Sequence, residues 1–229
     1  MSASTDEFRT LVRLALPLMG AQLLQMAQGV MDTIMAGHLS ARDLGGIALA
    51  LNVLWPSQFL LSGLVLAATP IIAQLRGAGR VAEVGEVVRQ GLWIITFAAL
   101  TLMVLWRNAD FIYVMLEIEP QTRAIAVGYL QATSWGAFPL LGYFLVRYLC
   151  EGMGETRPAM YMALIALIAK LPLNYAFMYG HWGAPALGGV GTGVASGILW
   201  WFELAGMLAV TRLPFARPTG LYDRFSWPS

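Results

Sequence analysis

Long apolar stretches, separated by short polar segments, form the main pattern of this chain. Six of them are long enough for helices that cross a bilayer, which need about 17–25 mostly apolar residues. Runs such as residues 92–105 lack the alternation of apolar and polar positions that marks the strands of a membrane barrel. The pattern therefore predicts an all-α membrane protein with one six-helix transmembrane bundle over residues 1–211. The expected spans are about residues 11–36, 44–73, 90–106, 125–148, 159–179 and 188–210.

The ends of the chain and the longest stretch carry further expectations. The first stretch is too long for the apolar core of a signal peptide, and Asp6 and Glu7 precede it, so we expect a retained span. The second is longer than a bilayer requires, which predicts tilt or a kink at Pro56. Residues 212–229 hold three prolines and three arginines. We interpret them as a cytoplasmic tail or a truncated linker.

Composition agrees with a membrane location. Of the 229 residues, 58% are hydrophobic and 12% are charged, against about 25% charged in soluble domains. The bilayer is therefore the expected environment. The net charge of +1 gives no reason to expect a nucleic-acid partner. The single cysteine, Cys150, cannot form an intrachain disulfide.

The arginines predict the orientation in the membrane. With both termini in the cytoplasm, ten arginines fall on the inner side and three, Arg42, Arg107 and Arg123, on the outer side. Because basic residues concentrate in cytoplasmic loops, this count predicts a multi-pass protein of the inner (plasma) membrane with both termini cytoplasmic. The ten inner residues are Arg9, Arg13, Arg76, Arg80, Arg89, Arg147, Arg157, Arg212, Arg217 and Arg224.

Three ionisable residues stand out inside the apolar stretches: Asp32, Lys170 and Glu203. Each costs about 2.5–3.5 kcal/mol at the bilayer centre on insertion scales, so each is a candidate functional residue. Asp32 shares one helical face with three glutamines, Gln22, Gln25 and Gln28. Its carboxylate can bind a proton or a sodium ion. The alternatives are hydrogen bonding between helices and an aspartate that lies at the membrane interface.

The fifth stretch offers a second candidate for ion coupling. Lys170 and Asn174 are four residues apart and share a face, with Pro172 between them. Proline removes a backbone donor and frees the carbonyl four residues earlier, so this kinked segment is a candidate cation or substrate site. Lys170 is a possible ion-pair partner of Asp32 or Glu203. A purely structural ion pair, or a lysine reaching toward the interface, is the alternative.

Several stretches present mixed polar and aromatic faces, which favour flat, cationic, partly apolar ligands through stacking and cation–π contacts. Single aromatic residues at helix seams are more often structural. The weaker candidates for a substrate cavity are Gln25, Gln28, Asn52, Trp55, Gln131, Thr192, Ser196 and Glu203.

Signatures of enzymes and cofactor sites are weak. Lys170 is the only lysine, so a phosphate-binding GxxxxGK[ST] loop cannot exist, and residues 188–193 do not complete GxGxxG. Two separated histidines, His38 and His181, are too few ligands for a zinc site. We therefore expect no enzyme activity, no cofactor and no metal other than a sodium ion at Asp32. Gly189, Gly193 and Gly197 recur every four residues and predict close helix packing.

A set of motifs in fixed order resembles the N-terminal half of the multidrug and toxic compound extrusion (MATE) transporters, in their NorM-like branch. The resemblance extends over nearly the whole chain. It rests on Met31–Gly37, on Thr69-Pro70 with Ala73-Gln74-Leu75, on Glu151-Gly152 with Thr156-Arg157-Pro158, on Pro172–Tyr175, and on Gly183-Ala184-Pro185 with Leu187–Gly191.

The resemblance implies one lobe of a twelve-helix antiporter that expels cationic drugs or dyes while sodium ions or protons enter. It assigns ion coupling to Asp32 and a polar role to Asn174. Lys170 departs from the asparagine common in relatives. A second six-helix lobe, or another copy of the chain, is the implied partner. The alternatives are a membrane enzyme that uses Asp32 and Glu203, or a half-transporter bundle that does not transport.

Overall fold

Helices make up nearly all of the backbone that the computed structural model describes, which is residues 2–219 and 221. The rest of the expected tail, residues 220 and 222–229, lies outside the described residues. The helices are α1 (Ser2–Leu39), α2 (Ala41–Leu66), α3 (Ala68–Gly77), η1 (Val81–Glu83), α4 (Val84–Arg107), α5 (Asp110–Met115), α6 (Pro120–Ser134), α7 (Ala137–Gly152), α8 (Arg157–Tyr179), α9 (Gly189–Val210) and η2 (Arg217–Thr219).

Two of the expected spans are interrupted, and a proline accounts for each interruption. The second expected span is divided between α2 and α3 at Ala67. Pro70 has no N–H to donate to the Leu66 carbonyl, four residues earlier. The fourth is divided between α6 and α7, where Pro139 cannot donate to the carbonyl of Trp135. In contrast, α2 continues through Pro56, the position where we expected a kink.

Four helical stretches among the described residues are long and apolar enough to cross a bilayer: Ala41–Gly77, Val81–Arg107, Arg157–Tyr179 and Gly189–Val210. The first of these combines α2 and α3. The fourth expected span does not qualify because α6 and α7 are each too short after the break. The polar face of α1, with its three glutamines and Asp32, lowers the hydropathy of that helix.

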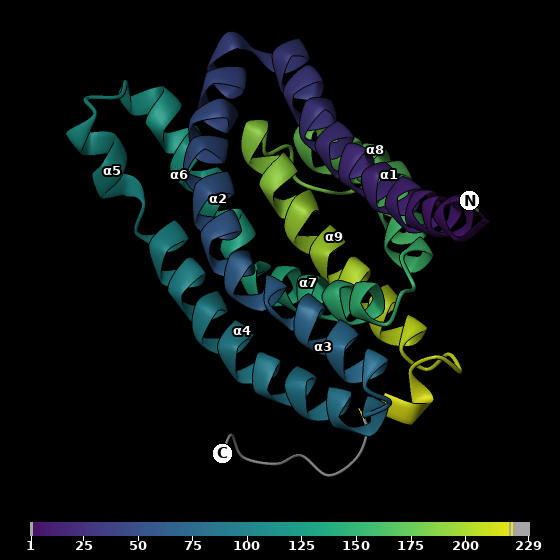
Figure 1. The fold of residues 1–229 in the computed structure, drawn as a ribbon. Helices are drawn as coiled ribbons and strands as arrows, with labels where there is room; N and C mark the ends of the chain where they lie inside the picture. Colours follow the sequence, from purple (N-terminus) through teal and green to yellow (C-terminus); the bar gives the residue numbers. More distant parts are fainter. Residues whose placement is uncertain (1, 220, 222–229) are drawn as a thin grey trace.

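The helices run back and forth between two ends of the bundle (Figure 1). The α1–α2 connection, α5 and the α8–α9 loop lie at one end, whereas the α3–α4 turn, the α7–α8 turn and the end of α9 lie at the other. In sequence-distant contacts, α8 packs against both α1 and α9, and α6 packs against α2 and α9. These contacts bring the polar faces of α1, α8 and α9 toward one another.

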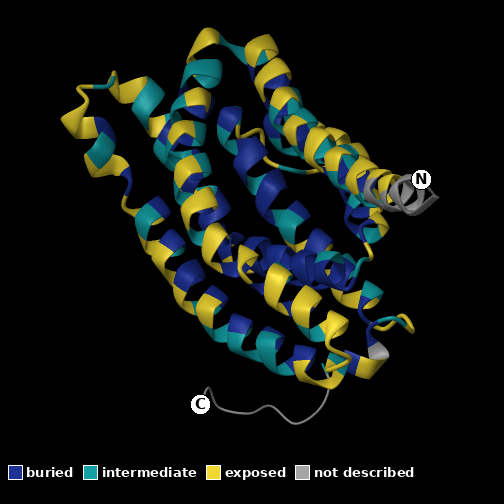
Figure 2. Cartoon of the chain, in the orientation of Figure 1, coloured by how far each residue is buried: buried dark blue, intermediate teal, exposed yellow. Residues whose placement is uncertain are grey.

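The burial pattern separates a core from an outer belt (Figure 2). Nearly every residue of α7 is buried, and α9 also has a largely buried face. The outer faces of α1, α4 and α8 instead expose large apolar side chains. On α1 they recur every three or four residues, as a helical stripe: Phe8, Val12, Leu16, Met19 and Leu23. Met26, Val30 and Ile34 continue this spacing and are also exposed, but they border the interior cavity. Such exposed apolar stripes suit a surface in contact with lipid.

The glycine stripe of α9 packs closely against α6, as the four-residue spacing predicted. A Cβ at Gly193 would lie 2.8 Å from the carbonyl oxygen of Tyr129, and one at Gly197 would lie 2.8 Å from the Trp135 ring. Glycine is therefore required for the observed separation of these helices. Glu203 lies on the same helix as Gly193 and Gly197, so this close contact helps to position that residue.

Candidate functional site

A cavity of about 620 Å³ opens between the helices. Residues of α1, α2, α6, α7, α8 and α9 line it. Aromatic rings form much of its wall, and Trp55 stacks on Phe59 with ring centroids 5.4 Å apart. Seven of the residues predicted from the sequence line it: Gln25, Gln28, Asp32, Trp55, Lys170, Ser196 and Glu203.

The centre of the site is a buried cluster formed by Asp32, Lys170 and Asn174. The Lys170 Nζ lies 2.8 Å from Asp32 Oδ2. The Asn174 Nδ2 donates to Asp32 Oδ1 at 2.7 Å. Asp32 is only 2% exposed and Lys170 only 5%. Between the two partners that sequence analysis left open for Lys170, the structure therefore selects Asp32.

Helix geometry explains why these three side chains meet. Lys170 and Asn174 are one turn apart on α8, so both reach the same point on α1. Each oxygen of Asp32 has a partner, and the ammonium has its counter-charge. Paired and hydrogen-bonded in this way, both charges can be buried; either charge alone would carry a desolvation penalty of several kcal/mol.

A second polar chain runs from α1 to α7. Arg147 Nε donates to Glu151 Oε1 at 2.7 Å, and Arg147 Nη1 donates to Gln25 Oε1 at 3.1 Å. Arg147 lines the cavity and is 6% exposed. The sequence analysis counted this arginine in a cytoplasmic segment, but its side chain is buried and points into the cavity lining. The glutamate four residues later was the available signal, because that spacing places an ion-pair partner on the same helical face.

Glu203 of α9 is the fourth charged group that lines the cavity, with 3% of its surface exposed. The Gln28 side chain hydrogen-bonds to it, and the charges of Lys170 and Arg147 act on it. Its Oε1 atom has no hydrogen-bond partner among the described residues. A carboxylate oxygen left unpaired in a buried wall is energetically costly, so a ligand in the cavity would relieve that cost.

Three of the expected cavity residues lie elsewhere. Asn52 and Gln131 are exposed on α2 and α6, and Gln131 donates to the Arg107 carbonyl at 3.4 Å. Thr192 is buried, but its hydroxyl donates to the Gly189 carbonyl in its own helix at 2.8 Å. Spacing along one helix placed these residues with their neighbours, but it could not show which face of that helix meets the cavity.

Cation ligands are available at only part of this site. Among the described residues, no group of three histidine, cysteine or acidic side chains could hold a metal ion. Beside Asp32, the side chain of Asn174 also carries an oxygen, Oδ1, which is buried and has no hydrogen-bond partner in the described part of the chain. Oxygen ligands of this kind suit a hard cation such as sodium once the Lys170 ammonium has moved away.

Outside the spans, a charged pair lies at the α3–α4 turn. Arg80 donates through Nε and Nη2 to both oxygens of Glu83, at 2.5 and 2.6 Å. This contact holds the pKa of Glu83 below its usual value. Both side chains are exposed, so the pair contributes little to stability. It provides a useful comparison for the buried pair.

Comparison with known proteins identifies the family. A sequence model described as MatE matches residues 17–176. The chain belongs to the MATE family. It is thus a multi-pass membrane protein of a transporter family, which removes the membrane enzyme from the alternatives. Its helical bundle corresponds to one lobe of the solved MATE structures.

The relatives and structures agree on the extent of the match. The chain is 42% identical over 224 residues to the "Multidrug resistance protein MdtK" of Klebsiella pneumoniae (strain 342), covering 97% of this chain and 49% of the relative. It therefore spans about half the length of the curated relatives it matches. The fold resembles the eukaryotic MATE transporter AtDTX14, with a TM-score of 0.87, 16% identity, and coverage of 94% of this chain and 48% of that one. For Vibrio cholerae VcmN in the bent form, the TM-score is 0.81 at 18% identity, covering 97% and 50%.

Proposed function

We propose that this chain forms the N-terminal bundle of a cation-coupled antiporter that exports cationic drugs or other xenobiotics. The observation that carries the proposal is the buried Asp32 carboxylate, held by Lys170 and Asn174 at the wall of an aromatic cavity. A buried charged group inside a membrane protein is a functional site by default. The multidrug resistance relative MdtK supports the choice of substrate class.

Exchange of partners at Asp32 is the proposed coupling step. In the structure, the Lys170 ammonium lies at Oδ2 of that carboxylate. A sodium ion or a proton that enters the cavity would take the place of this ammonium, and Asn174 Oδ1 would supply a second oxygen for sodium. Because the entering ion and the ammonium compete for one carboxylate, ion occupancy would change the charge distribution inside the cavity.

Transport requires a second bundle. Alternating access in such transporters comes from two bundles that rock about a shared site. We propose that a second six-helix lobe, or another copy of this chain, supplies the opposite wall of the pathway. That the chain covers half of each relative is consistent with this partner. No nucleic acid and no cofactor other than the coupling ion enter the proposal.

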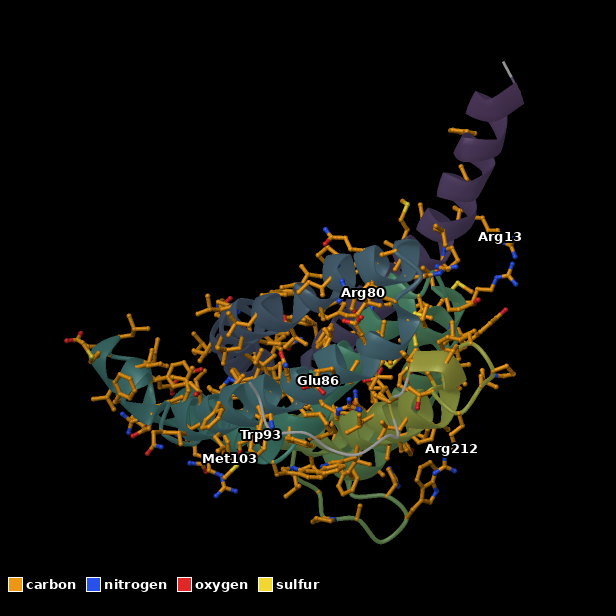
Figure 3. The ribbon with its side chains drawn as sticks, turned by 60° about the horizontal axis from the view of Figure 1, so that its bottom comes forward. Arg13, Arg80, Glu86, Trp93, Met103 and Arg212 are labelled. Atoms are coloured by element: carbon orange, nitrogen blue, oxygen red, sulfur yellow. The ribbon has the colours of Figure 1, made fainter. Side chains whose placement is uncertain are left out.

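We further propose an inner-membrane location with both termini in the cytoplasm. Support comes from the end of the bundle where α3 stops and α8 begins, where Arg13, Arg76 and Arg157 line one polar hollow. Figure 3 turns the bottom of the molecule toward the viewer and labels Arg13, Arg80 and Arg212. Basic residues of this density are typical of the cytoplasmic side.

Reconstitution tests the function. The chain is placed in proteoliposomes together with the C-terminal bundle of an MdtK relative, and ethidium efflux is followed under a sodium gradient or a proton gradient. We expect efflux under one of these gradients and little efflux from the chain alone. Asp32→Asn should abolish coupled efflux, because the amide carries no charge for the driving ion.

The matched control is Asp110→Asn, the same carboxyl-to-amide change at a residue that pairs with Arg123 in the α4–α6 connection. This variant should export as the wild type does. Unchanged coupling in Asp32→Asn would refute the role of Asp32. Absence of efflux in the reconstituted wild type, with both bundles inserted, would favour the remaining alternative of a bundle that does not transport.

A further inference from the structure

The charged side chains on the cavity wall do not balance in pairs. Asp32 is paired with Lys170 at 2.8 Å. Arg147 is paired with Glu151 at 2.7 Å. Of the charged residues that line the cavity, Glu203 is the one that forms no ion pair within the described part of the chain, since Lys170 pairs with Asp32 and Arg147 pairs with Glu151. When ionised, it is a negative charge on a wall whose other charged side chains are each held in an ion pair.

The position of Glu203 suits a ligand rather than a structural contact. Its carboxyl group lies on the cavity wall, is 3% exposed, and has one oxygen, Oε1, without a hydrogen-bond partner among the described residues. Gln28 holds the group from the α1 side. A buried acceptor without a donor costs free energy until a donor or a cation reaches it.

Aromatic residues line the same cavity as this carboxyl group. Trp200 lies one turn earlier on α9 and also lines the cavity, with its ring centroid 6.2 Å from that of Trp106. Tyr143 of α7 is close enough for Glu203 to act on it electrostatically. A carboxylate and aromatic rings in one cavity both attract an organic cation, because the negative charge and the ring quadrupoles each favour a positive charge.

We propose that Glu203 binds the cationic group of the exported compound and that Asp32 does not, since Lys170 already occupies Asp32. This assignment rests on the proposed export function. The ligand class is an aromatic monocation, with its charge at Glu203 and its rings against Trp200 and Tyr143. The driving ion and the exported cation then use two different carboxylates, on α1 and on α9.

Direct binding to the 229-residue chain in lipid nanodiscs tests the assignment without the second bundle. The probes are tetraphenylphosphonium, a permanent cation, and triphenylphosphine oxide, an uncharged analogue with similar rings. Glu203→Gln should weaken the binding of tetraphenylphosphonium by about 30-fold or more, the effect expected when one partner of a desolvated charge pair is removed. It should leave the binding of triphenylphosphine oxide within about threefold, which also shows that the cavity is intact.

Two further variants separate the carboxylates. Asp32→Asn combined with Lys170→Asn removes the buried pair without changing the net charge, so it should weaken the binding of tetraphenylphosphonium much less than Glu203→Gln does, and an equal or larger loss would contradict the assignment. Glu203→Asp keeps the charge but shortens the side chain by one methylene. Its affinity for tetraphenylphosphonium should therefore lie between that of the wild type and that of Glu203→Gln. Asp110→Asn serves as a control at a distant carboxyl group.

The outcomes distinguish this assignment from the export function itself. If the wild type binds both probes and Glu203→Gln leaves tetraphenylphosphonium unaffected, the assignment of Glu203 is wrong while the drug cavity stands. Equal loss of both probes in Glu203→Gln would show a structural role and would also refute it. If the wild type binds neither probe, the proposed drug cavity fails, and the assignment fails with it.

Discussion

At the scale of single residues, the pairing of Lys170 with Asp32 is the most informative contact. A lysine that faces a carboxylate 2.8 Å away satisfies its charge but also competes with any cation for the same oxygens. Asn174 donates to the other oxygen at 2.7 Å, so in the proposed exchange the carboxylate would keep one of its partners. The site is thus arranged as a carboxylate with an internal competitor.

A double-mutant cycle measures this contact. Lys170→Met leaves Asp32 as an uncompensated buried charge, so we expect a loss of about 3–5 kcal/mol in the free energy of unfolding. Asp32→Asn should also destabilise, and the double variant should be less destabilised than the sum. The expected coupling is about 0.5–3 kcal/mol, measured by denaturant unfolding in detergent.

The exposed Arg80–Glu83 pair is the control: treated with the same cycle, it should show a much smaller coupling. Additive losses at Asp32 and Lys170 would show that the two charges do not interact.

At the scale of helices, prolines and glycines decide how the apolar stretches pack. Pro139 interrupts the fourth stretch, and the resulting α7 is buried along nearly its whole length. Gly193 and Gly197 allow α9 to approach α6 so closely that a methyl group would meet the backbone or a ring at 2.8 Å. The cavity wall depends on both features, since α7 and α9 carry Arg147 and Glu203.

Substitution of the packing glycine tests this arrangement. Gly193→Ala should destabilise the bundle by about 1–3 kcal/mol, because the added methyl group forces α6 and α9 apart. Gly63 of α2 is the matched control, since a Cβ there has nothing within 4 Å. Gly63→Ala should stabilise the chain by about 0.5–1 kcal/mol through its better helix propensity. Thermal unfolding of both variants gives the comparison, and equal effects at the two positions would contradict the proposed close contact.

At the scale of the whole molecule, the alternation of the helices divides the loops between two ends. His38 and His181 fall at one end, and Arg80 lies at the α3–α4 turn of the other. The basic residues gather at the second end, around the hollow of Arg13, Arg76 and Arg157. Because cytoplasmic loops are enriched in arginine, we expect this second end of the bundle to face the cytoplasm.

Cysteine labelling in intact cells tests this orientation. Cys150 is buried and free, and Cys150→Ser provides a background without reactive thiols. In that background, His38→Cys and His181→Cys should react with a membrane-impermeant maleimide, whereas Arg80→Cys should react only after lysis. All three positions are exposed, so a difference reports sidedness and not burial. Labelling of Arg80→Cys in intact cells would reverse the assigned topology.

The sequence by itself determined the helical membrane class and the identity of three of the buried charged residues, Asp32, Lys170 and Glu203. Hydropathy and helical spacing are local properties, so they were sufficient to predict the apolar stretches and the close packing of Gly193. The cost of burying charge singled out Asp32, Lys170 and Glu203. The order and spacing of short motifs also indicated the MATE family, which the comparisons confirm.

Tertiary structure alone decided which of these groups meet. It paired Lys170 with Asp32 and left Glu203 without an ion partner among the residues that the structure describes, although both pairings were open from the sequence. It also brought Arg147 into the cavity and placed Asn52 and Gln131 outside it. The reason is physical: spacing along one helix orders residues around that helix only, whereas a contact between α1 and α8 depends on how both helices rotate and tilt against α9.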